Sequence, residues 1–224
     1  MAQSEYDSKF ETKNAKSDKL KAAFNQVSDI RKFEIDLYWK RAGYFWALIA
    51  VAFAGYFAIL SSANIPSKFF LSFIVGSIGF VFTFAWYLVN RGSKYWQENW
   101  ENHLDLLEDE ITGPLYKTLL ERPKETSLSE WFVTGPLNVS VSKINQWVSV
   151  FVLFIWVSLA AYSVYKTLTM LQISQNDWLV LCAHLIVTAV ALISCFVMVA
   201  RGKTHKGEHN PNMIIRKTTI GKRL

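Results

Sequence analysis

Two groups of histidines are the residues whose type and spacing could support chemistry. His184 and Thr188 are four residues apart in a long apolar run, so they share one face of a helix. An ionisable side chain at membrane depth is a candidate functional group, but this run contains no acidic partner, which favours a neutral, hydrogen-bonded histidine over a proton relay. His205, Glu208 and His209 have metal-ligand spacing, but they lie in a tail with little helix propensity. We therefore expect no metal site.

Motifs of enzymatic chemistry are missing from the sequence. It contains no Ser-His-Asp or Cys-His arrangement, no pair of carboxylates in an apolar setting and no Gly-rich phosphate loop. Cys182 and Cys195 fall on nearly opposite faces of one helix and are interpreted as small apolar residues. We expect neither enzymatic activity nor a cofactor.

Four apolar runs of about 20 residues carry most of the hydrophobic residues, and this length crosses a bilayer as a helix. The runs are Ala42–Ser62, Phe69–Asn90, Trp147–Thr169 and Trp178–Ala200. Lys166 is the only charged residue in them. The predicted fold class is an all-α polytopic membrane protein, with four transmembrane helices in two hairpins plus amphipathic cytoplasmic helices.

The basic residues indicate the orientation in the membrane. Of the 24 lysines and arginines, all except Lys68 and Lys166 lie before residue 42, between residues 91 and 146, or after residue 200. Because basic residues accumulate on the cytoplasmic side, both termini and the central segment are predicted to be cytoplasmic. Topology accounts for the net charge of +6, so membrane lipids are expected as partners and nucleic acid is not.

This topology divides the chain into five parts. We predict a cytoplasmic tail and amphipathic helix over 1–41, a transmembrane hairpin over 42–90, a cytoplasmic helical segment over 91–146, a second hairpin over 147–200 and a basic cytoplasmic tail over 201–224. Residues 1–17 are expected to be disordered. Ser17 or Asp18 can then cap a helix that runs unbroken from about residue 18 to about residue 60. Its first third either projects into the cytoplasm or lies on the bilayer.

The central segment starts with an amphipathic helix that we expect to pack at the membrane surface and to end at Thr112-Gly113-Pro114. Its apolar face comprises Trp96, Trp100, His103, Leu104, Leu107 and Ile111, and its acidic face comprises Glu98, Glu101, Asp105, Glu108 and Asp109. Two tryptophans on a water-facing helix would form an exposed patch. We therefore predict an oligomer interface formed by Trp96, Trp100, Leu104, Leu107, Glu101, Asp105 and Glu108.

Small residues recur at helical spacing in the first two apolar runs. The first run carries Ala50, Ala54 and Ala58, and the second carries Ser72, Gly76, Gly79 and Thr83. Small residues let helix backbones approach closely, so the favoured interpretation is that these two faces pack the first hairpin together. The alternative is that the second set lines a polar path at an oligomer axis, which requires several copies of the chain.

Three segments resemble one protein family. RKFEIDLYWKRAGYFW (Arg31–Trp46), YWQENWENHLDLLEDEITGPLYK (Tyr95–Lys117) and SVSKINQ (140–146) are similar to segments of the small bacterial inner-membrane proteins of the RipA type. The resemblance implies a bacterial inner-membrane protein that assembles with itself as a ring-like octamer. It also implies a setting in stress, host adaptation or defence, and it supplies no catalytic residues.

Three functions are compatible with these observations. The favoured one is a homo-oligomeric membrane assembly with a central pore or lumen and a cytoplasmic helical ring. The second is a non-conducting scaffold that recruits a cytoplasmic protein partner. A small four-helix transporter is disfavoured, because such exporters need a membrane-embedded carboxylate and no apolar run contains one.

Overall fold

The computed structural model describes residues 3–120, 133, 135, 137–170 and 177–204. In these ranges the chain forms helices and connections but no strand. The helices are α1 (Gln3–Phe10), α2 (Asp18–Ser61), α3 (Lys68–Leu107), α4 (Val141–Met170) and α5 (Asp177–Arg201). Four of them, α2 to α5, are long and apolar enough to cross a membrane, which confirms the predicted all-α polytopic class.

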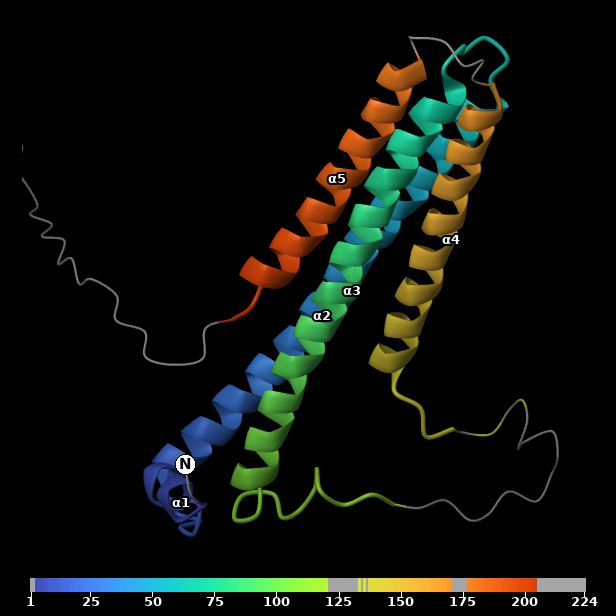
Figure 1. Cartoon of the computed structure of the whole chain (residues 1–224). Coiled ribbons are helices and arrows are strands. Elements are labelled where there is room, and N and C mark those ends of the chain that lie inside the picture. The colour runs from blue at the N-terminus through green and yellow to red at the C-terminus, as the bar shows by residue number, and fades with distance from the viewer. Residues whose placement is uncertain (1–2, 121–132, 134, 136, 171–176, 205–224) are drawn as a thin grey trace, which may run out of the picture.

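The helices α2 and α3 are much longer than a membrane requires. They contain 44 and 40 residues, so at 1.5 Å per residue each spans about 60 Å, roughly twice the hydrocarbon thickness of a bilayer. They run side by side as one antiparallel pair, and α4 and α5 flank only part of it (Figure 1). We call the part beyond the apolar runs, residues 18–41 of α2 and 91–107 of α3, the shaft.

The shaft confirms one expectation about helix continuity and changes another. The unbroken helix predicted from about residue 18 to about residue 60 is present, and Ser17 caps it by accepting a hydrogen bond from the Leu20 amide at 3.2 Å. The amphipathic helix expected at the membrane surface is instead the uninterrupted continuation of the second span. It ends at Leu107, short of Thr112-Gly113-Pro114, although Gly113 has the expected positive φ of 71°.

The N-terminal segment is ordered where we expected disorder. Tyr6 of α1 is buried against Leu20 and Val27 of α2 and Leu104 and Leu107 of α3. Although residues 1–17 contain few apolar residues, Tyr6 and Phe10 lie one helical turn apart and both pack against the end of the shaft.

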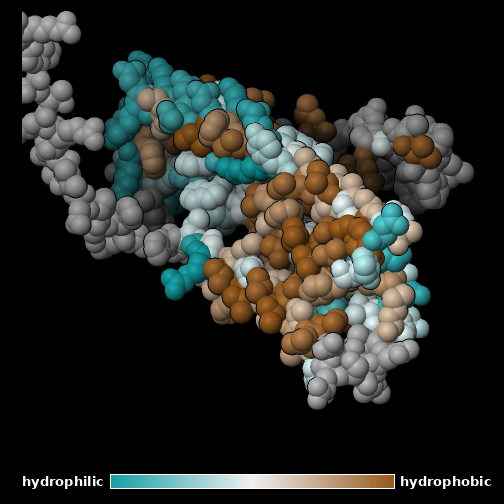
Figure 2. Space-filling view, turned by 90° about the horizontal axis from the view of Figure 1, so that it is seen from above, coloured by the Kyte–Doolittle hydropathy of each residue, from teal (hydrophilic) through white to brown (hydrophobic). Residues whose placement is uncertain are grey.

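Packing in the membrane part is organised around α3, which contacts α2, α4 and α5. The largest buried side chains there are Trp86 of α3, Trp156 of α4 and Tyr56 of α2. Most of α5 is exposed within the single chain. Figure 2 shows hydrophobic residues gathered into one broad area and hydrophilic residues gathered apart from it. This separation is the surface pattern of a protein whose apolar part lies in a bilayer.

Candidate functional site

The small residues of α3 form a groove that receives Trp156 of α4. Ser72 and Thr83 have no exposed surface, and the Trp156 ring is also fully buried. A Cβ atom at Gly79 would lie 2.6 Å from Trp156 Cη2 and closer still to Cζ2 and Cε2. At Gly76 a Cβ atom would make an ordinary contact, 3.6 Å from Tyr56 Cε2. Gly79 is therefore the position at which only glycine admits the indole ring.

Hydrogen bonds between side chains hold α4 in this groove. Trp156 stacks on Phe53 of α2 with 4.0 Å between ring centroids, and its Nε1 donates to Thr83 Oγ1 at 3.0 Å. The Tyr56 hydroxyl lies 2.9 Å from both the Leu159 carbonyl and Ser163 Oγ. Such bonds are strong where water is excluded, so α2, α3 and α4 form one packed unit.

This arrangement revises the expected role of the small-residue faces. Ala50, Ala54 and Ala58 are exposed and do not pack against α3. The residues of α2 that face the core are instead Ile49, Ala52 and Tyr56. The set Ser72, Gly76, Gly79 and Thr83 faces Tyr56 and Trp156 of the same chain, so it does not line an outward-facing polar path.

The predicted interface residues Leu104 and Leu107 lie in the shaft core, where α1, α2 and α3 meet. Both are fully buried within the single chain. Trp100 is half-buried against the same cluster, whereas Trp96 is 39% exposed and stacks on Trp100 with 6.3 Å between ring centroids. Of the four apolar residues predicted to form an oligomer interface, Trp96 is the one whose ring remains most accessible.

A hydrogen bond between Tyr6 and His103 fastens α1 to the shaft. The Tyr6 hydroxyl lies 2.7 Å from His103 Nδ1, and both rings belong to a cluster with Phe10 and Trp100. Burial lowers the pKa of His103 and raises the pKa of Tyr6 to about 12. The contact therefore pairs a neutral imidazole with a protonated phenol near neutral pH.

Basic residues of the same chain offset much of the predicted acidic face. Arg31 of α2 forms an ion pair with Glu101 at 3.3 Å. Lys94 lies 3.4 Å from Glu98 and 3.8 Å from Glu101. Asp105 is half-buried and forms no ion pair with a described residue. The accessible acidic surface is thus smaller than the sequence indicates.

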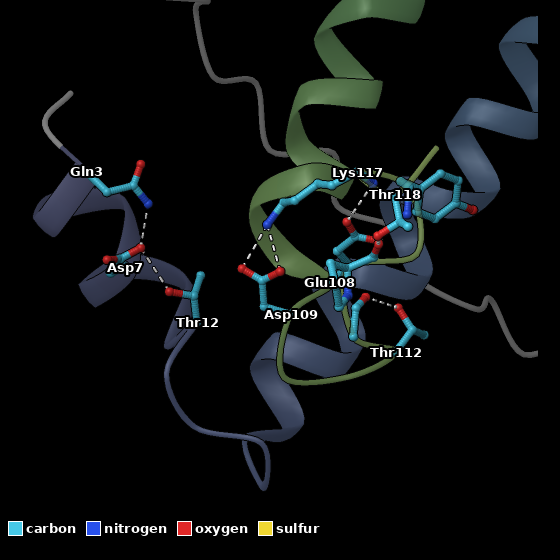
Figure 3. Close-up of polar contacts among 11 residues, drawn as sticks. Gln3, Asp7, Thr12, Glu108, Asp109, Thr112, Lys117 and Thr118 are labelled. Atoms are coloured by element: carbon cyan, nitrogen blue, oxygen red, sulfur yellow. Dashed lines mark hydrogen bonds and ion pairs between the residues drawn. The ribbon is translucent and has the colours of Figure 1, made fainter. Parts of the chain in front are cut away.

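Glu108 does not belong to an exposed acidic face, because α3 has already ended there. Its carboxylate is fully buried and accepts hydrogen bonds from the backbone amides of Tyr116, at 2.6 Å, and Lys117, at 3.2 Å. Asp109 points outward and binds the Lys117 ammonium at 2.7 Å (Figure 3). Glu108 therefore holds the segment after α3 against the end of the shaft.

His184 is buried near the start of α5, between Phe70 and Phe73 of α3, with ring centroids 4.9 and 4.8 Å away. Its Nδ1 lies 2.8 Å from the Val180 carbonyl, so this nitrogen carries the proton in that bond. Thr188 donates to the His184 carbonyl at 2.8 Å rather than to the imidazole. The second histidine group, His205 and His209 with Glu208, lies outside the described residues.

Sequence reasoning missed Trp156 and Tyr56, which hold the membrane part together. A signal for Trp156 was present, because membrane tryptophans concentrate at the two interfaces and this one lies in the middle of its apolar run. A bulky aromatic residue at that depth indicates a packing partner with small side chains.

Comparison with known proteins gives one match. A model of the octameric membrane protein family (8xMP) matches residues 21–165, which include α2 almost entirely, all of α3 and most of α4. No curated protein and no solved structure matches the chain. The matched range contains all but the first three residues of the shaft, and it contains the groove that receives Trp156.

Proposed function

Because the chain belongs to the octameric membrane protein family, we propose that eight copies form a cyclic ring in a bacterial inner membrane. The positive-inside distribution supports cyclic symmetry, because it gives every copy the same orientation. Dihedral symmetry would turn half of the copies upside down. The resemblance to the RipA-type proteins supports the bacterial inner membrane as the location.

We place the shafts on the cytoplasmic side, where eight of them form a helical ring. The basic residues that precede the apolar run of α2 and follow the apolar run of α3 support this orientation. Of the surfaces predicted to contact a neighbouring copy, the Trp96 ring and the exposed part of the acidic face remain accessible on the shaft. Reporter fusions at positions 127 and 206 are expected to give cytoplasmic signals, and a fusion at Asn64 is expected to give a periplasmic one.

A ring of eight such subunits encloses a lumen. With helices packed about 8–10 Å apart, a four-helix subunit is about 20 Å wide, so eight subunits side by side leave an axial space roughly 30 Å across. What fills this space depends on the surface that faces it. Aligned polar side chains would hold water, and an apolar wall would hold lipid.

The observation that supports a lipid-filled lumen is that polar side chains of the spans face the interior of each chain. Within the described spans, Ser72, Thr83, Ser149, Ser163 and His184 are buried inside the chain. The exposed hydroxyls of Ser158 and Thr188 donate to carbonyls of their own helices. Exposed span surfaces are otherwise dominated by large apolar and aromatic residues, and the exposed tyrosines, Tyr44, Tyr162 and Tyr165, lie toward the ends of their apolar runs. An apolar wall supports a non-conducting scaffold rather than an aqueous pore.

The proposed function is therefore an octameric scaffold that presents eight shafts to a cytoplasmic partner, without enzymatic activity, in a stress, host-adaptation or defence setting. Electron microscopy of the protein in lipid nanodiscs, combined with ion flux in liposomes, tests it. We expect eightfold rings with lipid density on the axis and no flux above protein-free liposomes. A hydrated axis with flux would instead establish a pore, and an assembly without eightfold symmetry would refute the ring.

A further inference from the structure

A groove of about 620 Å³ lies where α2, α3 and α5 leave their apolar runs, a volume within the range of small-molecule sites. Three boundary residues line it: Arg41 before the first run, Gly92 after the second and Gly202 after the fourth. We call it the Arg41 groove. Its position at the end of three apolar runs places it at the level of the lipid headgroups.

The Arg41 groove changes from apolar to charged along the direction of the membrane normal. Phe45, Val89 and Met198 line the side that lies within the apolar runs. Arg41 lies at the boundary, and Glu34 lies two helical turns further into the shaft on the same face of α2. A phospholipid has the same order of chemistry, from acyl chain through phosphate to headgroup substituent.

The charged end of the groove carries a cation and an anion side by side. Arg41 Nη1 donates to Ser93 Oγ at 3.2 Å and lies 3.7 Å from Glu34 Oε2, which is beyond hydrogen-bonding distance. Glu34 Oε2 is buried and accepts no hydrogen bond from the described residues. A buried carboxylate oxygen without a donor is costly. Because the Glu34 side chain is still 19% exposed, a ligand that supplies an N–H group can reach this carboxylate and would be stabilised there.

We propose that the Arg41 groove binds the headgroup of a zwitterionic aminophospholipid of the phosphatidylethanolamine type. The phosphate binds the Arg41 guanidinium, which has donors to spare beyond its bond to Ser93. The primary ammonium donates to the Glu34 carboxylate, and the upper acyl chain follows Phe45 and Met198. A phosphatidylcholine headgroup has no N–H donor for Glu34, and a phosphatidylglycerol headgroup carries neutral hydroxyls where the ammonium would pair with the carboxylate.

Native mass spectrometry of the full-length protein in detergent tests this assignment. The probes are phosphatidylethanolamine, phosphatidylcholine and phosphatidylglycerol, added separately at equal concentration. We expect one phosphatidylethanolamine per chain, bound about tenfold or more tightly than the other two lipids, which corresponds to one charge-assisted hydrogen bond. Glu34→Gln should remove this preference, while Arg41→Gln should weaken phosphatidylethanolamine and phosphatidylglycerol alike.

Two glycines provide a matched pair of variants. A Cβ atom at Gly92 meets nothing within 4 Å, and Gly92 lines the groove, so a leucine side chain can start there without overlap and is expected to extend into the groove. A Cβ atom at Gly43 also meets nothing within 4 Å, and this residue lies on α2 outside the groove. We expect Gly92→Leu to reduce bound phosphatidylethanolamine about tenfold or more and Gly43→Leu to leave it unchanged, and the same spectra report the oligomer mass.

Three outcomes would overturn the proposal. Equal binding of all three lipids, unaffected by Glu34→Gln, would mean that the groove does not recognise the ammonium. Absence of bound lipid from the parent protein, together with a lower oligomer mass for Gly92→Leu, would mean that a second copy fills the groove. The third outcome has two parts: the parent protein binds no lipid and Gly92→Leu keeps the parent oligomer mass, but lipid binds once residues 205–224 are removed. That result would mean that the chain's own tail occupies the groove.

Discussion

Replacing Gly79 by alanine tests the contact that fastens α4 to α3. The added Cβ atom would lie 2.6 Å from Trp156 Cη2 and closer to two other ring atoms. Carbon atoms pack at about 3.5–4.0 Å, so the ring must move by roughly 1 Å. That movement would stretch the 3.0 Å bond from Trp156 Nε1 to Thr83 beyond hydrogen-bonding distance.

The expected cost follows from three terms. Overpacking of a tight core costs about 1–3 kcal/mol, and loss of the hydrogen bond costs about 0.5–1.5 kcal/mol. Alanine recovers up to about 1 kcal/mol because it is a better helix former than glycine. Gly79→Ala should therefore destabilise the chain by about 0.5–4.5 kcal/mol. Thr83→Val, which keeps the shape but removes the acceptor, isolates the hydrogen-bond term.

The matched control is Gly76→Ala, one turn away on the same face. Its Cβ atom would lie 3.6 Å from Tyr56, an ordinary contact, so this variant should be neutral or stabilised by up to about 1 kcal/mol. The assay is thermal unfolding of detergent-solubilised protein followed by near-ultraviolet circular dichroism. A change of 1 kcal/mol shifts the midpoint by about 2–4 °C in a chain of this size. Equal midpoints for Gly79→Ala and Gly76→Ala would refute the role assigned to Trp156.

Three further predictions concern the shaft. Glu108→Ala should release the segment after α3, at about 1.5–3 kcal/mol for each of the two amide bonds lost, and limited proteolysis should detect new cleavage between residues 109 and 117. Burial lowers the pKa of His103, so its contribution to stability is fully present above the unfolded value of about 6.5 and is lost as pH falls through the folded value. The protection of α1 amides against exchange, taken relative to the intrinsic rate at each pH, should therefore fall at acidic pH, and less so in His103→Gln. Trp96→Ala should lower the oligomer mass without lowering the unfolding midpoint, because this ring is accessible in the single chain; an unchanged mass would remove Trp96 from the interface.

The sequence by itself determined the elements that depend on local properties. Four spans follow from the length and composition of the apolar runs, and the start of α2 follows from the capping hydroxyl of Ser17. Continuity of α2 through the membrane boundary follows from the absence of a helix breaker. Each of these features is decided by interactions within a few residues along the chain, so no knowledge of distant partners was needed.

Only the tertiary structure decided which surfaces these helices use. Helical spacing showed that Gly76 and Gly79 share a face, but the ring that fills it, Trp156, lies 77 residues beyond Gly79 on another helix. Periodicity defines the direction of a side chain without defining what it meets. The same limit applies to Glu108, whose place at helical spacing suggested an exposed carboxylate. Backbone amides eight and nine residues further along turn it inward, because a chain folding back on itself provides donors that the helix pattern does not contain.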